Sequence, residues 1–101
     1  NESYPKTYRI LQLVAALEQQ VGDMQAALGH WRTIAAGNTQ GGDKWLDARL
    51  HIVQILSTTS PIDALEVLNQ HHLLYPNYGK EPYGTTLKEL HAMLQGGEDG
   101  S

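Results

Sequence analysis

The stretch VGDMQAALGHWRTIAAGN, residues 21–38, encodes a helix with a marked start and a marked end. Gly22 permits the left-handed backbone that often ends a helix, and Asp23 can accept hydrogen bonds from the free N–H groups at the start of the next one. Apolar residues then recur at helical spacing until Gly37 closes the element. Because the link to the preceding apolar run is so short, the two helices must run antiparallel as a hairpin.

The run before Gly22 predicts the first helix of this hairpin. Pro5 suits a first helical position, because its missing N–H would be unpaired there anyway. Five apolar residues fall on one stripe of that helix: Ile10, Leu13, Val14, Leu17 and Val21. We therefore expect a hairpin over residues 5–37.

A second hairpin is expected over residues 43–76. The segment KWLDARLHIVQIL contains a β-branched piece that alone could form a buried strand, but its apolar pattern continues for three turns and favours a helix. Ser60 and Pro61 mark the start of the next helix as cap and first residue, and Pro76 stops it. Asp43 is the expected cap of the helix that opens this hairpin.

We expect one all-α domain of about five helices over residues 1–95. The last helix, residues 85–95, would begin at Thr85 or Thr86 and end at Gly96, and residues 96–101 are expected to form a disordered tail. Seven basic and 11 acidic residues give a net charge of −4, and the basic residues are scattered, so we expect no nucleic-acid partner. No apolar run has the length of a membrane span, and this balance is typical of a soluble, intracellular bacterial protein, which favours the cytoplasm.

The two expected hairpins share a small residue at matching places. Ala27 and Ala64 lie 37 positions apart, and each is followed four positions later by a large apolar residue, Trp31 or Leu68. With the Gly-Asp turn and the Pro after the second unit, this pattern resembles the tetratricopeptide-repeat family, whose units recur every ~34 residues. The small residue lets two helices approach closely.

The resemblance implies a short right-handed solenoid that binds a peptide or a partner protein in a groove, without catalysis. Carried over by register, the groove residues are Arg9, Gln12, Ala16, Gln19, Leu46, Arg49, Val53 and Leu56. Arg9 and Arg49 could hold an acidic group of the partner. Two units are fewer than the ~3 usually needed for stability, so we expect further repeats upstream, or a partner chain against the first helix. Trp45, Tyr4 and Tyr8 either form such an edge or complete the core.

Catalytic and metal-binding patterns are weak in this sequence. There is no Cys, no Gly-rich phosphate loop and no His-Glu-x-x-His, so we expect no enzyme, no metal and no cofactor. Asp47 and His51 share a helix face and could contribute to a zinc site, but an ion pair explains them more simply. His72 shares a helix face with Ile62, Leu65 and Leu68, with Leu73 beside them. It is expected to be a hydrogen-bonded residue between helices. A self-pairing spacer and an accessory domain of a larger enzyme are the alternative functions.

Overall fold

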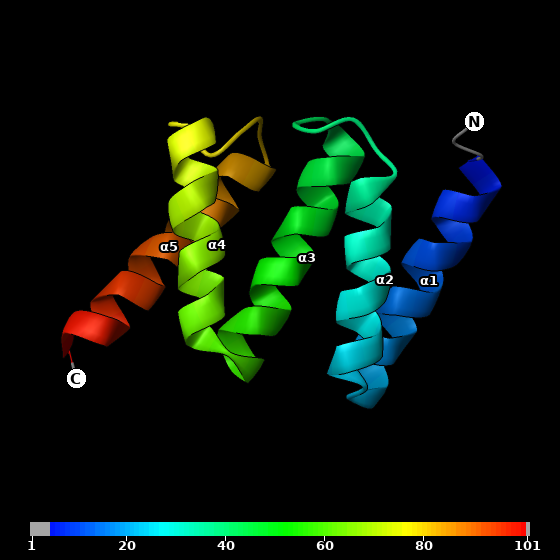
Figure 1. Cartoon of the computed structure of the whole chain (residues 1–101), viewed down its shortest axis with the longest axis horizontal. Helices are drawn as coiled ribbons and strands as arrows, with labels where there is room; N and C mark the ends of the chain where they lie inside the picture. The colour runs from blue at the N-terminus through cyan, green and yellow to red at the C-terminus, as the bar shows by residue number, and fades with distance from the viewer. Residues whose placement is uncertain (1–4, 101) are drawn as a thin grey trace. The chain divides into compact units, whose positions relative to one another are not determined.

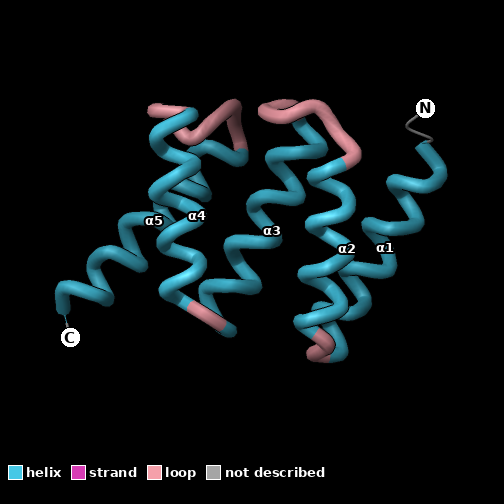
Figure 2. The backbone as a smooth tube through the Cα atoms, in the orientation of Figure 1, coloured by secondary structure: helices cyan, strands magenta, loops and turns pink. Residues whose placement is uncertain are grey.

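The computed structural model describes residues 5–100, and the part it describes is all-α, as predicted (Figure 1). The helices are α1 (Pro5–Val21), α2 (Met24–Ala36), α3 (Asp43–Thr59), α4 (Pro61–Leu74) and α5 (Tyr83–Gly100). Within these residues the remaining chain forms only turns and loops (Figure 2).

Most helix ends fall where the sequence signals place them. Gly22 has a φ of 88°, in the left-handed region, and Asp23 caps α2 by accepting a hydrogen bond from the backbone N–H of Ala26 at 3.4 Å. Pro61 is the first residue of α4. Ser60 occupies the cap position, but its hydroxyl donates to Asp63 at 2.9 Å and does not cap the backbone.

The last helix is longer than expected at both ends. α5 begins at Tyr83, directly after Pro82, and continues past Gly96 to Gly100. Glycine lowers helix stability without ending a helix, and no proline follows Gly96 to force a stop.

The chain forms two compact units, Asn1–Ile52 and Val53–Ser101. The first contains α1, α2 and the first part of α3, and α1 packs along α2 as an antiparallel hairpin (Figure 1). Ala27 is fully buried, as the hairpin requires. The apolar core of this unit consists of Ala15, Ala27, Leu28, Trp31, Ile34, Trp45, Leu46, Ala48 and Ile52.

The second unit contains the end of α3, α4 and α5, with α4 packed against α5. Ala64 is fully buried here, as Ala27 is in the first unit. The buried set of this unit consists of Val53, Ile55, Leu56, Ala64, Leu68, His71, Tyr78, Leu87 and His91. Gly84 is also buried at the start of α5, because its Cα lies against the backbone of the preceding loop.

The buried face of α4 differs from the one we expected. Ile62 and Leu73 are 78% and 84% exposed, and His72 is exposed as well. Of the predicted face, Leu68 is buried as expected, and the other buried residues are Ala64 and His71, which lie four residues before it and three after it. His72 is therefore not buried as expected, although its ring stacks on Tyr78 and lies edge-on to His91 of α5. Its neighbour His71 is the buried histidine of α4. Among residues 5–100, no helix is both long and apolar enough to span a membrane.

Candidate protein-binding face

Helix α1 has an inward face that packs against its own unit. Ala15 lies at the centre of that face and is fully buried. Leu11, Gln12 and Gln19 are half-buried around it. Because Ala15 is small, α2 can approach α1 closely along this side.

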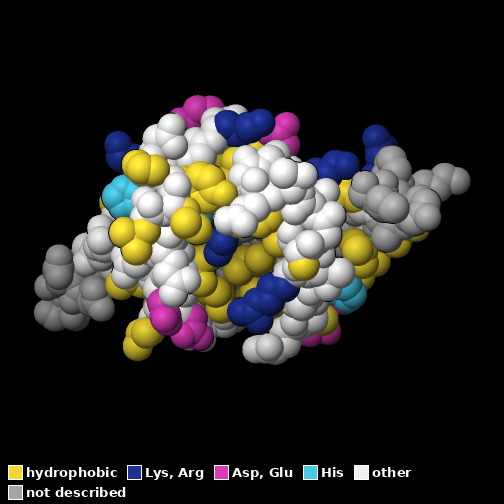
Figure 3. Space-filling view, turned by 45° about the horizontal axis from the view of Figure 1, so that its top comes forward, with side chains coloured by type: hydrophobic (Ala, Val, Ile, Leu, Met, Phe, Trp, Pro, Cys, Tyr) yellow, Lys and Arg dark blue, Asp and Glu magenta, His cyan; other side chains and the backbone are white. Residues whose placement is uncertain are grey.

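The opposite face of α1 carries large apolar side chains in solvent. Ile10, Leu13, Leu17 and Val21 are 60%, 64%, 59% and 78% exposed. Their spacing of three, four and four residues aligns them along one stripe of the helix. Hydrophobic side chains are visible at the surface on the α1 side of the molecule, at the right of Figure 3. We call these four residues the outer face of α1.

Polar side chains on the inward side of α1 fix which face points outward. The Gln19 side-chain oxygen accepts a hydrogen bond from the Trp31 indole N–H at 2.8 Å. The same oxygen lies 3.2 Å from Nδ1 of His51, whose ring stacks on Trp31 with centroids 4.0 Å apart. Rotating α1 to bury the outer face would break these contacts and leave the buried indole N–H without its acceptor.

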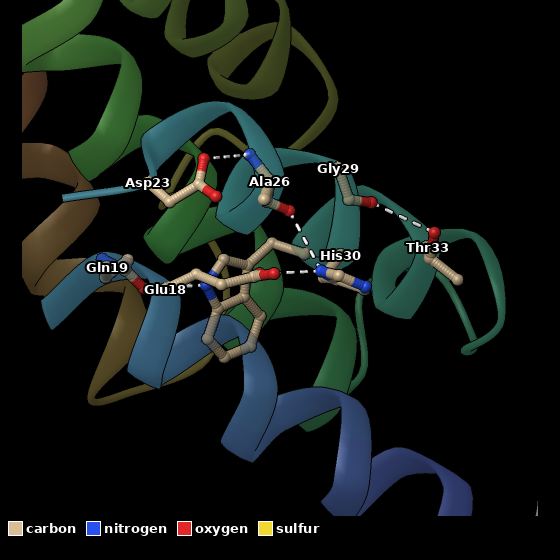
Figure 4. Close-up of polar contacts among 8 residues, drawn as sticks. Glu18, Gln19, Asp23, Ala26, Gly29, His30 and Thr33 are labelled. Carbon is tan, nitrogen blue, oxygen red and sulfur yellow. Dashed lines mark hydrogen bonds and ion pairs between the residues drawn. The ribbon is translucent and has the colours of Figure 1, made fainter. Parts of the chain in front are cut away.

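Side-chain contacts of Glu18 and Gln12 also hold α1 with its outer face toward solvent. Glu18 lies 2.7 Å from Nδ1 of His30 on α2, and the two side chains point toward each other in Figure 4. Gln12 donates to the Asp47 carboxylate on α3 at 3.5 Å. The orientation of α1 is therefore held from both neighbouring helices of its unit.

His51 shows how the surroundings of this network act on a titratable group. Burial lowers the pKa of His51, and the negative charge of Asp47, 3.6 Å away, acts in the opposite direction. Within residues 5–100, no group of three or more His, Asp or Glu side chains is placed to hold a metal ion. The Asp47–His51 contact is a helical i,i+4 pair inside the packing of the unit.

Several of the predicted groove residues are buried or make contacts within their own unit. Leu46, Val53 and Leu56 are buried at 0%, 0% and 4% exposure, so they serve the packing and offer no contact area to a partner. Gln12 and Gln19 make the internal hydrogen bonds described above. Within the first unit, the guanidinium of Arg49 lies over the Trp45 ring, 4.5 Å from its centroid.

Arg9 and Ala16 are the members of the predicted set that remain exposed. Both lie along one edge of the outer face, beside Leu13 and Leu17. The residues predicted for the groove therefore include two at the edge of this surface. The four residues at its centre were predicted only as part of the apolar stripe of the first helix. The sequence signal for this surface is that Gln12 and Gln19 lie on the side of α1 opposite to its largest apolar residues.

The aromatic residues expected at an edge have varied surroundings. Trp45 is 7% exposed and belongs to the core. Tyr8 is half-buried, and the Lys44 ammonium lies 4.7 Å from the centre of its ring. Tyr4 lies outside the described residues.

In the second unit, Tyr78 joins two helices through histidines. Its backbone carbonyl accepts from Nε2 of His71 at 2.9 Å, and its ring stacks on His72 with centroids 4.5 Å apart. Its hydroxyl lies 2.7 Å from Nδ1 of His91, whose Nε2 lies 2.7 Å from the side-chain oxygen of Asn69. Since that oxygen can only accept, Nε2 of His91 carries the proton and Nδ1 accepts from the tyrosine hydroxyl.

Tyr78 has a φ of 69°, a conformation that a bulky residue rarely adopts. The hydrogen bonds to His71 and His91 and the ring contact with His72 stabilise this backbone conformation. A pocket of about 530 Å³ opens beside the ring. It is lined by His72, Pro76, Asn77, Tyr78, Glu81, Gly84, Thr85 and Lys88. The Glu81 carboxylate already accepts from the backbone N–H and the hydroxyl of Thr85, so it serves as the cap of α5.

No protein-family model matches the chain, and comparisons with curated proteins and with solved structures found no significant match.

Proposed function

We propose that this protein is a non-catalytic interaction module that binds another protein through the outer face of α1. The observation that carries the proposal is the stripe of Ile10, Leu13, Leu17 and Val21, exposed by 59% to 78% on a helix whose opposite side packs against its own unit. Soluble proteins leave single apolar side chains exposed, whereas an aligned set marks a contact surface.

The size of the hydrophobic effect supports a docking role. Burying one large aliphatic side chain stabilises by roughly 1.5–3 kcal/mol, so covering four that are about two-thirds exposed gains roughly 4–8 kcal/mol from this side of the interface. Association costs an estimated 4–15 kcal/mol, which the partner's own apolar surface must help to offset. The face therefore suits a partner with a matching apolar stripe, such as an amphipathic helix.

The proposed architecture is a pair of degenerate tetratricopeptide-like hairpins, over residues 5–37 and 43–76. The support is the repeated device of a fully buried alanine, Ala27 or Ala64, on the second helix of each hairpin. A further helix added along the outer face of α1 would continue the same pattern of helix on helix. The non-catalytic assignment is supported by Gln19, His51 and His91, whose polar atoms make hydrogen bonds that hold helices together.

Site-specific photo-crosslinking tests the proposed function. A photoreactive residue replaces Leu17 on the outer face or, as the matched control, Leu73, which is 84% exposed on α4. In the cells that make the protein, we expect discrete adducts from position 17 that disappear when Leu13→Glu is added. Adducts that form equally at both positions, or that survive Leu13→Glu, contradict the proposal.

A further inference from the structure

We infer that the occupant of the outer face is α1 of a second copy of this chain, packed antiparallel around a twofold axis between Leu13 and Leu17. This inference rests on the proposed function and names the partner. An antiparallel pair of this kind joins two α1–α2 hairpins through one continuous apolar seam.

The spacing of the outer face is self-complementary. A twofold axis that crosses the face between Leu13 and Leu17 brings Leu13 of one copy near Leu17 of the other. The same axis brings Ile10 near Val21 of the second copy. Every large residue of the stripe then contacts another large apolar residue, and the three- and four-residue spacing is that of helices that pack with interlocking side chains.

The charges at the two ends of the stripe favour the antiparallel arrangement. Arg9 is exposed near the start of α1, and Asp23 is exposed just past its end. Antiparallel pairing places Arg9 of each copy near Asp23 of the other, at both ends of the seam. Parallel pairing would instead gather the two Arg9 side chains at one end and the two Asp23 side chains at the other. It would also align the two helix dipoles in the same direction.

The edge of the seam is open enough for close contact. Ala16 is exposed at one edge of the outer face, so no large side chain at that position hinders the contact between the two helices. With 17 residues, α1 is about 25 Å long. One helix pair of that length falls at the small end of specific interfaces, below about 1,200 Å². We therefore expect a reversible dimer whose population depends on protein concentration.

Sedimentation velocity over a wide range of concentrations tests the self-pairing. The full chain is expected to change from monomer to dimer as its concentration rises. The double variant Leu13→Glu, Leu17→Glu is expected to stay monomeric throughout. The matched control Ile62→Glu, Leu73→Glu, which alters two exposed apolar residues of α4, should dimerise as the unaltered chain does. Circular dichroism verifies that both variants keep their helices.

Engineered cysteines test the direction of the pairing, since the chain contains none of its own. Mixing Leu13→Cys with Leu17→Cys should give a disulfide-linked dimer under mild oxidation, because the twofold axis brings these two positions together. Arg9→Cys alone should not, since antiparallel pairing separates the two copies of position 9 by about 20 Å along the seam. Mixing Arg9→Cys with Asp23→Cys should give the cross-linked heterodimer.

The outcomes separate this inference from the proposed function. A chain that is monomeric at every concentration overturns the self-pairing. A dimer that survives Leu13→Glu, Leu17→Glu, or that does not cross-link between Leu13→Cys and Leu17→Cys, overturns it as well. If adducts still form specifically at position 17 with a different protein, the protein-binding function stands and only the identity of the partner is wrong.

Discussion

Two histidines that make hydrogen bonds within their units are expected to make the stability of the protein depend on pH. Burial lowers the pKa of His51, and Asp47 partly opposes this effect. Burial also lowers the pKa of His91, and the nearby charge of His72 adds to that effect. Above the ordinary value of 6.5, both rings are neutral in the folded and the unfolded chain.

As the pH falls below 6.5, the unfolded chain binds protons at these rings before the folded chain does. We therefore expect the free energy of unfolding to fall through the window between 6.5 and the lower pKa values of the folded state. Urea titrations across this window measure the fall, and NMR titration of each ring identifies its source. Ring titration midpoints at or above those of the denatured chain would contradict the assignment.

The buried alanines set the distance between neighbouring helices. Ala27→Leu and Ala64→Leu each force a larger side chain into a fully buried position, and we expect each to cost about 1–3 kcal/mol in unfolding free energy. Ala16→Leu, at an exposed position of α1, is the matched control and should change the monomer by less than about 0.5 kcal/mol. Equal effects at the three positions would show that the alanines do not control the packing.

At the scale of the element, two helical glycines allow the steric effect of an added methyl group to be measured separately from the helix propensity of alanine. A Cβ at Gly84 would run into the carbonyl oxygen of Gly79 and lie 3.1 Å from that of Asn77. A Cβ at Gly29 in α2 would meet nothing within 4 Å. The same substitution should therefore have opposite effects at the two sites.

We expect Gly29→Ala to stabilise by roughly 0.5–1 kcal/mol, because alanine loses less backbone entropy in a helix. Gly84→Ala should destabilise the second unit by more than that gain, because both atoms that block the new methyl group belong to the backbone. Thermal unfolding of the two variants measures both effects. A stabilising Gly84→Ala would mean that α5 does not start against the loop of residues 75–82.

The sequence predicts where most helices begin and end, but it does not predict which face of each helix points into the core. Gly22, Asp23 and Pro61 act locally, so their signals place the turns correctly. The direction in which a helix faces depends on its neighbours. Along α1, the side with the smaller Ala15 points inward because Gln19 bonds Trp31 and His51, residues that only the fold brings near.

The same limit applies to α4 and to the candidate site. Ile62 and Leu73 made a plausible core stripe, but close packing uses Ala64, Leu68 and His71. Leu46 and Val53 were assigned to a groove by family register, and the structure buries both. A stripe of large apolar residues identifies a contact face without saying whether that contact lies inside the chain.

At the scale of the molecule, the two units divide the chain within α3, between Ile52 and Val53. Each unit buries an alanine and a large residue one turn later, Trp31 in the first and Leu68 in the second. The first unit also presents the outer face of α1, which its own packing leaves in solvent. Under the proposed function, folding and docking use different sides of this helix.

The unfolding free energies of Leu17→Ala and Leu28→Ala, measured at concentrations too low for association, test this division most directly. Leu17 is 59% exposed on the outer face of α1, and Leu28 is 5% exposed in the core. If the outer face serves docking, Leu17→Ala should change the stability by less than about 0.5 kcal/mol, while Leu28→Ala should cost about 2–5 kcal/mol. A loss of similar size in both variants would show that the outer face belongs to the core and would contradict the proposed binding surface.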